Sequence, residues 1–285
     1  MIAVTGATGQ LGRLVIEALL KQLPASEIVA AVRNPEKAED LAAKGVQVRL
    51  ADYDLPETLE PAFTGVDKLL LISASELGRR VPQHRAVIEA AKGAGVKLIA
   101  YTSILHADRS PLGLAEEHRQ TEAALEASGV PHVVLRNGWY AENYTQSVPV
   151  ALQHQAFLGS AGEGRVAWAS RADYAEAAAA VLTAEADQAG RIYELAGDQA
   201  YTLAELAAEV ARQSGQPVVY KDLPEAAYKE ILVGVGLPEP VAAMIAESDV
   251  GAAKGGLFDD GRQISALTGH LTATLEQSVA AALGR

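Results

Sequence analysis

Cysteine is absent from this 285-residue sequence, which excludes disulfide bonds, a thiolate nucleophile and any metal site built on cysteine. Basic residues are few, with 24 Lys and Arg against 36 Asp and Glu, and the resulting net charge of -12 repels nucleic acid and anionic membrane surfaces. No apolar run approaches the length of a membrane span, and no basic segment of a secretory signal precedes the first strand. We therefore expect a cytoplasmic protein without membrane insertion or a nucleic-acid partner.

The motifs of metal-dependent and serine hydrolases are also missing. Six histidines occur without H-E-x-x-H or paired spacing, and no G-x-S-x-G sequence is present, so the sequence predicts no metal site and no serine acyl transfer. His84, His106 and His118 adjoin polar residues and are expected to be surface or capping histidines.

What the chain does contain is an apolar strand that runs directly into a glycine-punctuated turn and a helix. Gly6, Gly9 and Gly12 are three residues apart, unlike the G-x-G-x-x-G fingerprint, but they serve the same physical needs. Gly6 allows a tight turn, Gly9 lets a pyrophosphate approach the backbone, and Gly12 lets the helix lie close to the strand. The stretch predicts a dinucleotide site, and a glycine-rich turn without a ligand is the alternative.

Strands and helices alternate regularly through the first half of the chain. We expect a first strand from Ile2 up to the glycine turn and further strands at residues 27–32, 45–50, 66–72, 96–103 and 132–136, separated by helices. Such alternation predicts an α/β fold, a Rossmann-type doubly wound parallel sheet, with a smaller mixed α/β C-terminal domain. We place the NAD(P)-binding domain at residues 1–145 and the substrate-side domain at residues 146–285, packed on the first with some exchange of elements.

Beyond Pro149 the pattern loosens into short elements. Strands are expected at Arg165–Ala169, Arg191–Leu195 and Val218–Tyr220. Residues 249–260 form a mobile-looking segment, which either folds over a ligand or is a surface loop with solvated acids. The cleft between the two domains is the default substrate site.

Residues at the carboxyl ends of the strands are candidates for cofactor contacts. Arg33 ends the second strand, where a guanidinium can pair with the 2′-phosphate of NADP, and a solvated surface arginine is the alternative. Asp52 ends the third strand and either accepts from the adenine amino group or caps the following helix. Ser73, Ala74 and Ser75 are small enough to let a ribose and nicotinamide pass close over the fourth strand.

An amide- and aromatic-rich stretch, Asn137 to Tyr144, follows the sixth strand. Its position is typical of ligand contacts in α/β enzymes, and an aromatic plug between the sheet and the C-terminal segment is the alternative.

The acid used in ketone reduction is missing. Short-chain dehydrogenases usually carry Tyr-x-x-x-Lys after the fifth strand, whereas residues 104–131 contain neither Tyr nor Lys, and Ser103 lacks those partners. Hydride transfer to an acceptor that needs no strong acid remains. A quinone is such an acceptor, because its reduction gains aromaticity and its oxygens can be protonated by water or a weak donor.

Several stretches together resemble the atypical short-chain dehydrogenases of the NmrA-like group and, within it, the bacterial type 2 NADPH:quinone oxidoreductases and triphenylmethane reductases. These stretches are Met1–Gly12, Ala31–Pro35, Lys68–Ser75, Ala100–Ser103, Ser110–Ala115, Leu135–Asn143 and Gly255–Asp260.

The resemblance implies a role for each part of the site. The phosphates would be held by Gly6, Ala7, Thr8, Gly9, Gln10 and Leu11, and the 2′-phosphate by Arg33. Ser73, Ala74 and Ser75 would face the ribose. Asn137, Gly138, Trp139 and Tyr140 would contact the nicotinamide, and Asn143 and Tyr140 are our candidates for orienting the acceptor oxygen.

The resulting hypothesis is a flavin- and metal-free reductase that passes two electrons at once, as hydride from NADPH in preference to NADH, to a small-molecule quinone. One alternative is an NADP(H)-binding redox sensor that regulates a partner without turnover. Another is a reductase of cationic triphenylmethane dyes, which the negative charge of the chain would suit. The sequence leaves a homodimer open.

Overall fold

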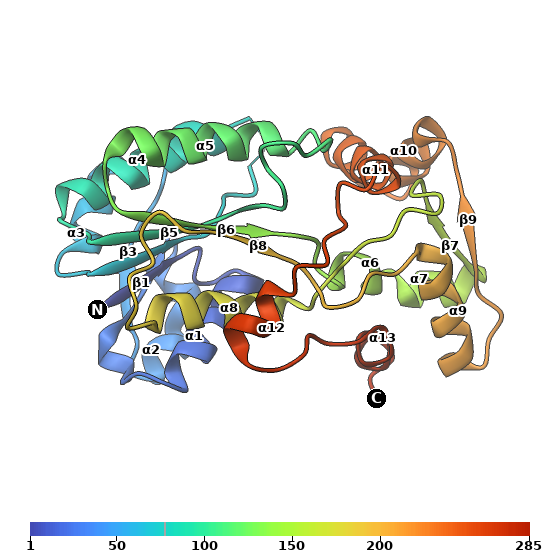
Figure 1. Ribbon diagram of the computed structural model, residues 1–285, viewed down its shortest axis with the longest axis horizontal. Coiled ribbons are helices and arrows are strands. Elements are labelled where there is room, and N and C mark those ends of the chain that lie inside the picture. Colours follow the sequence, from blue (N-terminus) through green and yellow to red (C-terminus); the bar gives the residue numbers. More distant parts are fainter. Residues whose placement is uncertain (77) are drawn as a thin grey trace. The chain divides into compact units, whose positions relative to one another are not determined.

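The computed structural model describes residues 1–76 and 78–285, and a seven-stranded sheet is its largest element (Figure 1). Its strands lie in the order β3 (Gln47–Leu50), β2 (Ile28–Val32), β1 (Ile2–Thr5), β4 (Lys68–Leu71), β5 (Leu98–Ile104), β6 (His132–Asn137) and β8 (Ile192–Leu195). All pairings from β3 to β6 are parallel. This is the strand order of a dinucleotide-binding sheet. The predicted doubly wound fold is confirmed.

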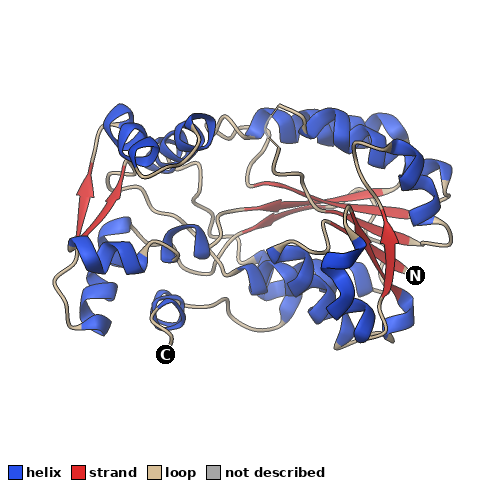
Figure 2. Cartoon of the chain, turned by 180° about the vertical axis from the view of Figure 1, so that it is seen from behind, coloured by secondary structure: helices blue, strands red, loops and turns tan. Residues whose placement is uncertain are grey.

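Helices cover both faces of this sheet (Figure 2). One face carries α3 (Leu59–Phe63), α4 (Arg80–Gly93) and α5 (Ala115–Ser128), and the other carries α1 (Gln10–Leu20), α2 (Glu39–Ala43) and α8 (Arg171–Thr183). Strands covered on both faces must be apolar along their whole length, and β2 and β5 are buried at every position. In the core on the α4 side, Leu69 and Ile99 of the sheet pack with Phe63 and Ile88 of the helices.

The alanine-rich helix α8 packs along α1, because its small side chains let the two helix axes come close. Lys68, the first residue of β4, secures the end of this helix. Its Nζ donates to the carbonyl oxygens of Leu182 at 2.7 Å and of Ala184 at 3.2 Å. The lysine thereby supplies donors to carbonyls that a helix leaves without partners at its C-terminus.

Packing divides the chain into two compact units that interleave along the sequence. The first consists of Met1–Ala107, Glu116–Asn137 and Arg171–Tyr193, and the second of Asp108–Ala115, Gly138–Ser170 and Glu194–Arg285. The sequence predicted two continuous domains that meet after residue 145 and exchange some elements. Helix α8 belongs to the first unit because it covers α1.

The second unit is mainly helical. Its elements are α6 (Glu142–Thr145), α7 (Val148–His154), β7 (Ala156–Gly159), α9 (Leu203–Ser214), β9 (Val219–Asp222), α10 (Glu225–Gly234), α11 (Glu239–Ala253), α12 (Gln263–Thr268) and α13 (Leu275–Ala282). Strands β7 and β9 form a separate parallel pair. Trp168, Leu206 and Leu257 are fully buried in its core.

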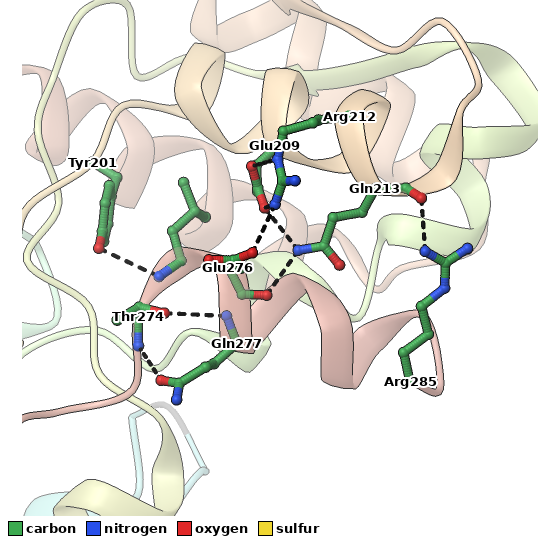
Figure 3. Close-up of polar contacts among 9 residues, drawn as sticks. Tyr201, Glu209, Arg212, Gln213, Thr274, Glu276, Gln277 and Arg285 are labelled. Atoms are coloured by element: carbon green, nitrogen blue, oxygen red, sulfur yellow. Dashed lines mark hydrogen bonds and ion pairs between the residues drawn. The ribbon is translucent and has the colours of Figure 1, made fainter.

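The C-terminal helix α13 is fastened to α9 by polar contacts (Figure 3). Arg212 pairs with Glu276 at 3.0 Å, and the Gln213 side chain donates to the Glu276 carbonyl oxygen at 2.8 Å. Arg285 donates in turn to the carbonyl oxygen of Gln213. A capping box between Thr274 and Gln277 begins the helix.

One expectation for the second half of the chain needs correction, and one strand was missed. Arg165–Ala169 is not a strand, since it makes only isolated bridges, Val166 to Tyr201 and Ala169 to Tyr140. Strand β7 was missed, because its four residues are recognisable only by their pairing with β9. The strands expected at Arg191–Leu195 and Val218–Tyr220 are confirmed as β8 and β9.

Candidate functional site

The turn between β1 and α1 is built from main-chain atoms. Gly6 has a φ of +59°, and the N–H of Gly9 donates to the Gly6 carbonyl oxygen at 2.9 Å. A Cβ on Gly12 would collide with that same carbonyl oxygen and lie 2.8 Å from the Cα of Ala7. Only glycine at position 12 therefore lets α1 approach the turn this closely.

The N-terminus of α1 is open to an anion. Its N-cap, Gly9, offers no side-chain acceptor, and the first turn contains no acidic residue. Gly6, Gly9 and Gln10 are exposed. First-turn N–H groups and the positive end of the helix dipole thus fit a diphosphate. The predicted phosphate ligands, Gly6, Ala7, Thr8, Gly9, Gln10 and Leu11, all lie in this turn or in the first turn of α1, and their contact with a cofactor stays a prediction.

The loop after β4, which contains the predicted ribose-side residues Ser73–Ser75, is held by side chains from other elements. The Ser73 N–H donates to Thr102 Oγ1 at 2.8 Å. The Ala74 N–H donates to His84 Nε2 at 2.9 Å, and the Ala74 carbonyl oxygen accepts from Arg80 Nε at 2.8 Å. Both main-chain polar groups of Ala74 thus bond to side chains of α4.

His84 can hold Ala74 only in its neutral form. Since Nε2 accepts, the proton lies on Nδ1, which donates to Thr121 Oγ1 at 3.0 Å. Burial lowers the pKa of His84 to about 3, and the Arg80 guanidinium adds to the shift. The imidazole therefore stays uncharged across the physiological range.

The prediction of surface or capping histidines is wrong for His84 and His118, which are 0% and 6% exposed. His118 Nδ1 lies 2.7 Å from the Tyr101 hydroxyl, and burial holds its pKa well below the usual value. One signal could have found His84, because it shares the helical spacing of the buried residues Val87, Ile88 and Ala91.

Arg33 and Asp52 both follow strands of the first unit, as predicted. Arg33 lies one residue beyond β2 with its side chain 68% exposed, and its Nη1 is 3.3 Å from Glu76 Oε1. Asp52 Oδ1 accepts from the N–H of Asp54 at 3.0 Å, which closes a local turn and does not cap a helix. Contacts of Arg33 with a 2′-phosphate and of Asp52 with adenine stay predictions.

Asn137 ends β6 with a buried side chain whose Oδ1 has no hydrogen-bond partner in the part of the chain that the structure describes. A buried amide oxygen without a donor is costly, which marks the position as one where a ligand N–H would be stabilised. Gly138 follows, and its N–H donates to the Leu195 carbonyl oxygen at 2.7 Å. The amide thus fits a contact with a nicotinamide, which stays a prediction.

Main-chain bonds fix the segment that follows Gly138. Ala169 donates to the Trp139 carbonyl oxygen and accepts from the Ala141 N–H at 2.8 Å. Trp139, Tyr140 and Asn143 are half-buried, and their roles at a ligand stay predictions. Tyr144 instead belongs to the core of the second unit, where its ring lies 5.5 Å from that of Trp168.

The structure shows what Ser103 does without the usual Tyr and Lys. Its hydroxyl donates to Glu122 Oε1 on α5. Glu122 also receives a bidentate pair from Arg136 of β6, with Nη2 to Oε2 at 2.8 Å and Nε to Oε1 at 3.1 Å. Ser103 therefore completes a mostly buried ion pair, which agrees with the missing acid predicted from the sequence.

A second buried carboxyl, Asp249, was not found from the sequence. It is 2% exposed and accepts from the Ser160 N–H at 2.9 Å and from the Tyr144 hydroxyl at 3.1 Å. Burial raises the pKa of Asp249 to about 6, although both hydrogen bonds favour the carboxylate. The expectation of a mobile segment starting at Asp249 is wrong, because residues 249–253 form the last turn of α11.

Among the described residues no cluster of three or more His, Cys, Asp or Glu is suited to a metal ion. In the same part of the chain, every helix is too short or too polar to cross a membrane.

Comparison with known proteins identifies the family of this chain. The model of the NmrA-like family matches residues 1–283. Quinone oxidoreductase 2 of Escherichia coli is 61% identical over 279 residues, which is 98% of this chain and 97% of that protein.

Solved structures agree with the sequence comparison. The NADPH complex of the E. coli quinone oxidoreductase matches 99% of this chain and 100% of its own, with 60% identity and a TM-score of 0.97. The Citrobacter sp. triphenylmethane reductase complexed with NADP(H) matches 99% of this chain and 100% of its own, with 41% identity and a TM-score of 0.95. Fold, glycine turn and both comparisons agree: the chain belongs to the NmrA-like family.

Proposed function

We propose that this protein is an NADPH-dependent quinone reductase that works without flavin or metal. The observation that carries the proposal is the near full-length identity of 61% to E. coli quinone oxidoreductase 2. The open N-terminus of α1 independently supports the dinucleotide part of the proposal, because it offers N–H groups and a helix dipole to a diphosphate.

The chain's own residues divide the work of holding the cofactor. Gly6–Leu11 bind the pyrophosphate, Arg33 the 2′-phosphate, Asp52 the adenine, Ser73–Ser75 the ribose, and Asn137–Tyr140 the nicotinamide. Bound NADPH supplies a hydride, and NADP⁺ is left. The fixed loop after β4 and the donor-less Asn137 oxygen support this assignment.

The choice of a quinone as the hydride acceptor rests on the acid that the site lacks. Helix α5 carries no Tyr and no Lys, and the Ser103 hydroxyl is engaged by Glu122, so no strong acid is prepared for a ketone oxygen. A quinone gains two electrons and one proton as hydride and takes a second proton from water or a weak donor. Tyr140 and Asn143 orient its oxygen by hydrogen bonding.

The test is the loss of reduced-nicotinamide absorbance on protein shown to be free of flavin. NADPH and NADH are each offered with a benzoquinone, a naphthoquinone and a cationic triphenylmethane dye. Rapid oxidation of NADPH by a quinone supports the proposal, whereas binding of NADPH without turnover on any acceptor contradicts it and favours the redox sensor.

The dye is included because one observation favours it as a second substrate class. The Citrobacter triphenylmethane reductase matches this chain over its full length with a TM-score of 0.95. Faster turnover of the dye than of either quinone would make dye reduction the main activity. A homodimer and a cytoplasmic location stay predictions.

A further inference from the structure

One carboxylate in the first unit is shared by two arginines. Glu76 Oε1 lies 3.3 Å from Arg33 Nη1, and Glu76 Oε2 lies 3.3 Å from Arg79 Nη1. Arg33 follows β2, and Arg79 is the N-cap residue of α4. Two cations from separate elements thus converge on one anion beside the predicted adenosine end of the site.

Neighbouring groups hold this cluster in place. Arg79 Nη2 lies 2.8 Å from Asp54 Oδ1. The Gln83 amide, from the buried side of α4, donates to Asp54 at 3.2 Å and to Glu76 at 3.3 Å. Arg79 is therefore held by Asp54 as well as by Glu76.

The pairs to Glu76 are replaceable. The side chains of Arg33 and Arg79 are 68% and 60% exposed, and ion pairs between exposed groups contribute little because water and salt screen them. Guanidinium groups bind phosphate oxygens in the same geometry as carboxylate oxygens, and a phosphate carries more charge than a carboxylate. A phosphate monoester therefore competes well with Glu76 for both arginines.

We propose that Glu76 occupies, between Arg33 and Arg79, the position that the 2′-phosphate of the cofactor takes on binding. Arg79 is then a second ligand of the 2′-phosphate, and Glu76 is a competing anion that weakens NADPH binding and so tunes the preference over NADH. This inference rests on the proposed use of NADPH.

Nucleotide fragments test it without turnover. Calorimetric titration of the full chain with 2′,5′-ADP and with 5′-AMP isolates the 2′-phosphate, since the two differ only in that group. Glu76→Gln is expected to tighten 2′,5′-ADP by about three- to tenfold and to leave 5′-AMP within about twofold. Arg79→Gln is expected to weaken 2′,5′-ADP by about three- to tenfold and to leave 5′-AMP unchanged.

Glu36→Gln is the matched control, because it removes the same charge from an exposed acid in the turn just after Arg33. Equal tightening by Glu36→Gln and Glu76→Gln would overturn the inference, since bulk charge would then explain both. Unchanged or weaker binding of 2′,5′-ADP to Glu76→Gln would overturn it as well.

The experiments distinguish a failure of the proposed function from a failure of this inference. If neither NADPH nor NADH binds the unaltered protein, the cofactor assignment itself is wrong. If NADPH binds and is oxidised by a quinone while the Glu76 and Arg79 variants bind 2′,5′-ADP normally, only the present inference is wrong.

Discussion

The glycine turn after β1 and the loop after β4 follow adjacent strands of one sheet, yet they are stabilised by different kinds of atoms. Main-chain atoms close the first, through the Gly9 N–H and the Gly6 carbonyl oxygen. Side chains from β5 and α4 fix the second, through Thr102, Arg80 and His84. The first construction leaves no room for a side chain at position 12, whereas the second depends on side chains from other elements. Substitutions should therefore disrupt the two segments in different ways.

The largest effect is expected from Gly12→Ala. The new Cβ meets the Gly6 carbonyl oxygen and the Ala7 Cα, which are main-chain atoms and cannot move aside without opening the turn. We expect the free energy of unfolding to fall by about 3 kcal/mol and NADPH affinity to fall at least about tenfold. Denaturant unfolding and a fluorescence titration with NADPH measure the two effects.

Gly234→Ala is the control for this substitution. Gly234 is the last residue of α10, and a Cβ there would meet no atom within 4 Å. Unchanged or slightly higher stability is expected, because alanine favours a helix over glycine. Equal loss of stability in both variants would show that the close approach of α1 to the turn at Gly12 does not cause the loss in Gly12→Ala.

An intermediate effect is expected at the loop after β4. His84→Leu removes the acceptor of the partly buried Ala74 N–H, and leaving this donor unsatisfied costs about 2 kcal/mol. Stability should fall by that amount and the Kd for NADPH should rise severalfold, while kcat changes less. His84→Gln retains an acceptor near the Nε2 position and should restore most of the affinity. If the Gln and Leu variants bind NADPH equally, the loop does not depend on this bond.

The smallest expected effect is on the pH dependence of the free energy of unfolding. Unfolded His84 takes up a proton as the pH falls through about 6.5, while the folded imidazole stays neutral down to a pKa of about 3. Stability is therefore lost as the pH falls, by about 1 kcal/mol between pH 6.5 and 5.5 from this residue.

The difference between the unaltered protein and His84→Gln isolates that contribution. His118 and Asp249 titrate in both proteins, and Asp249 acts in the opposite sense because burial raises its pKa to about 6. Unfolding measured at several pH values should show a shallower loss in the variant. Parallel curves would mean that His84 is protonated in the folded state as easily as in the unfolded one.

Local patterns were enough to predict the parallel sheet and the glycine turn. Apolar runs identify strands buried on both faces, and three glycines between a strand and a helix identify a turn open to phosphate. The placement of Arg33 at the end of β2 followed from the same alternation. These features depend on neighbouring residues, so the sequence contains all the information they need.

The features that were missed depend on distant residues. His84 looked polar and exposed because its partners, Ala74 and Thr121, lie on other segments. Asp249 looked like a solvated acid because Ser160 and Tyr144, its donors, are far away in the sequence. Short elements such as β7 depend on pairing with β9, which no local pattern reveals.

The packing of α8 on α1 has a consequence during synthesis on the ribosome. Helix α1 leaves the ribosome long before α8, which packs along it but begins only at Arg171. At about 5–20 residues per second, α1 waits roughly ten to thirty seconds for this neighbour. Until Lys68 contacts the end of α8, the nascent chain presents a surface that a chaperone can bind. The first unit is therefore completed only in the second half of translation.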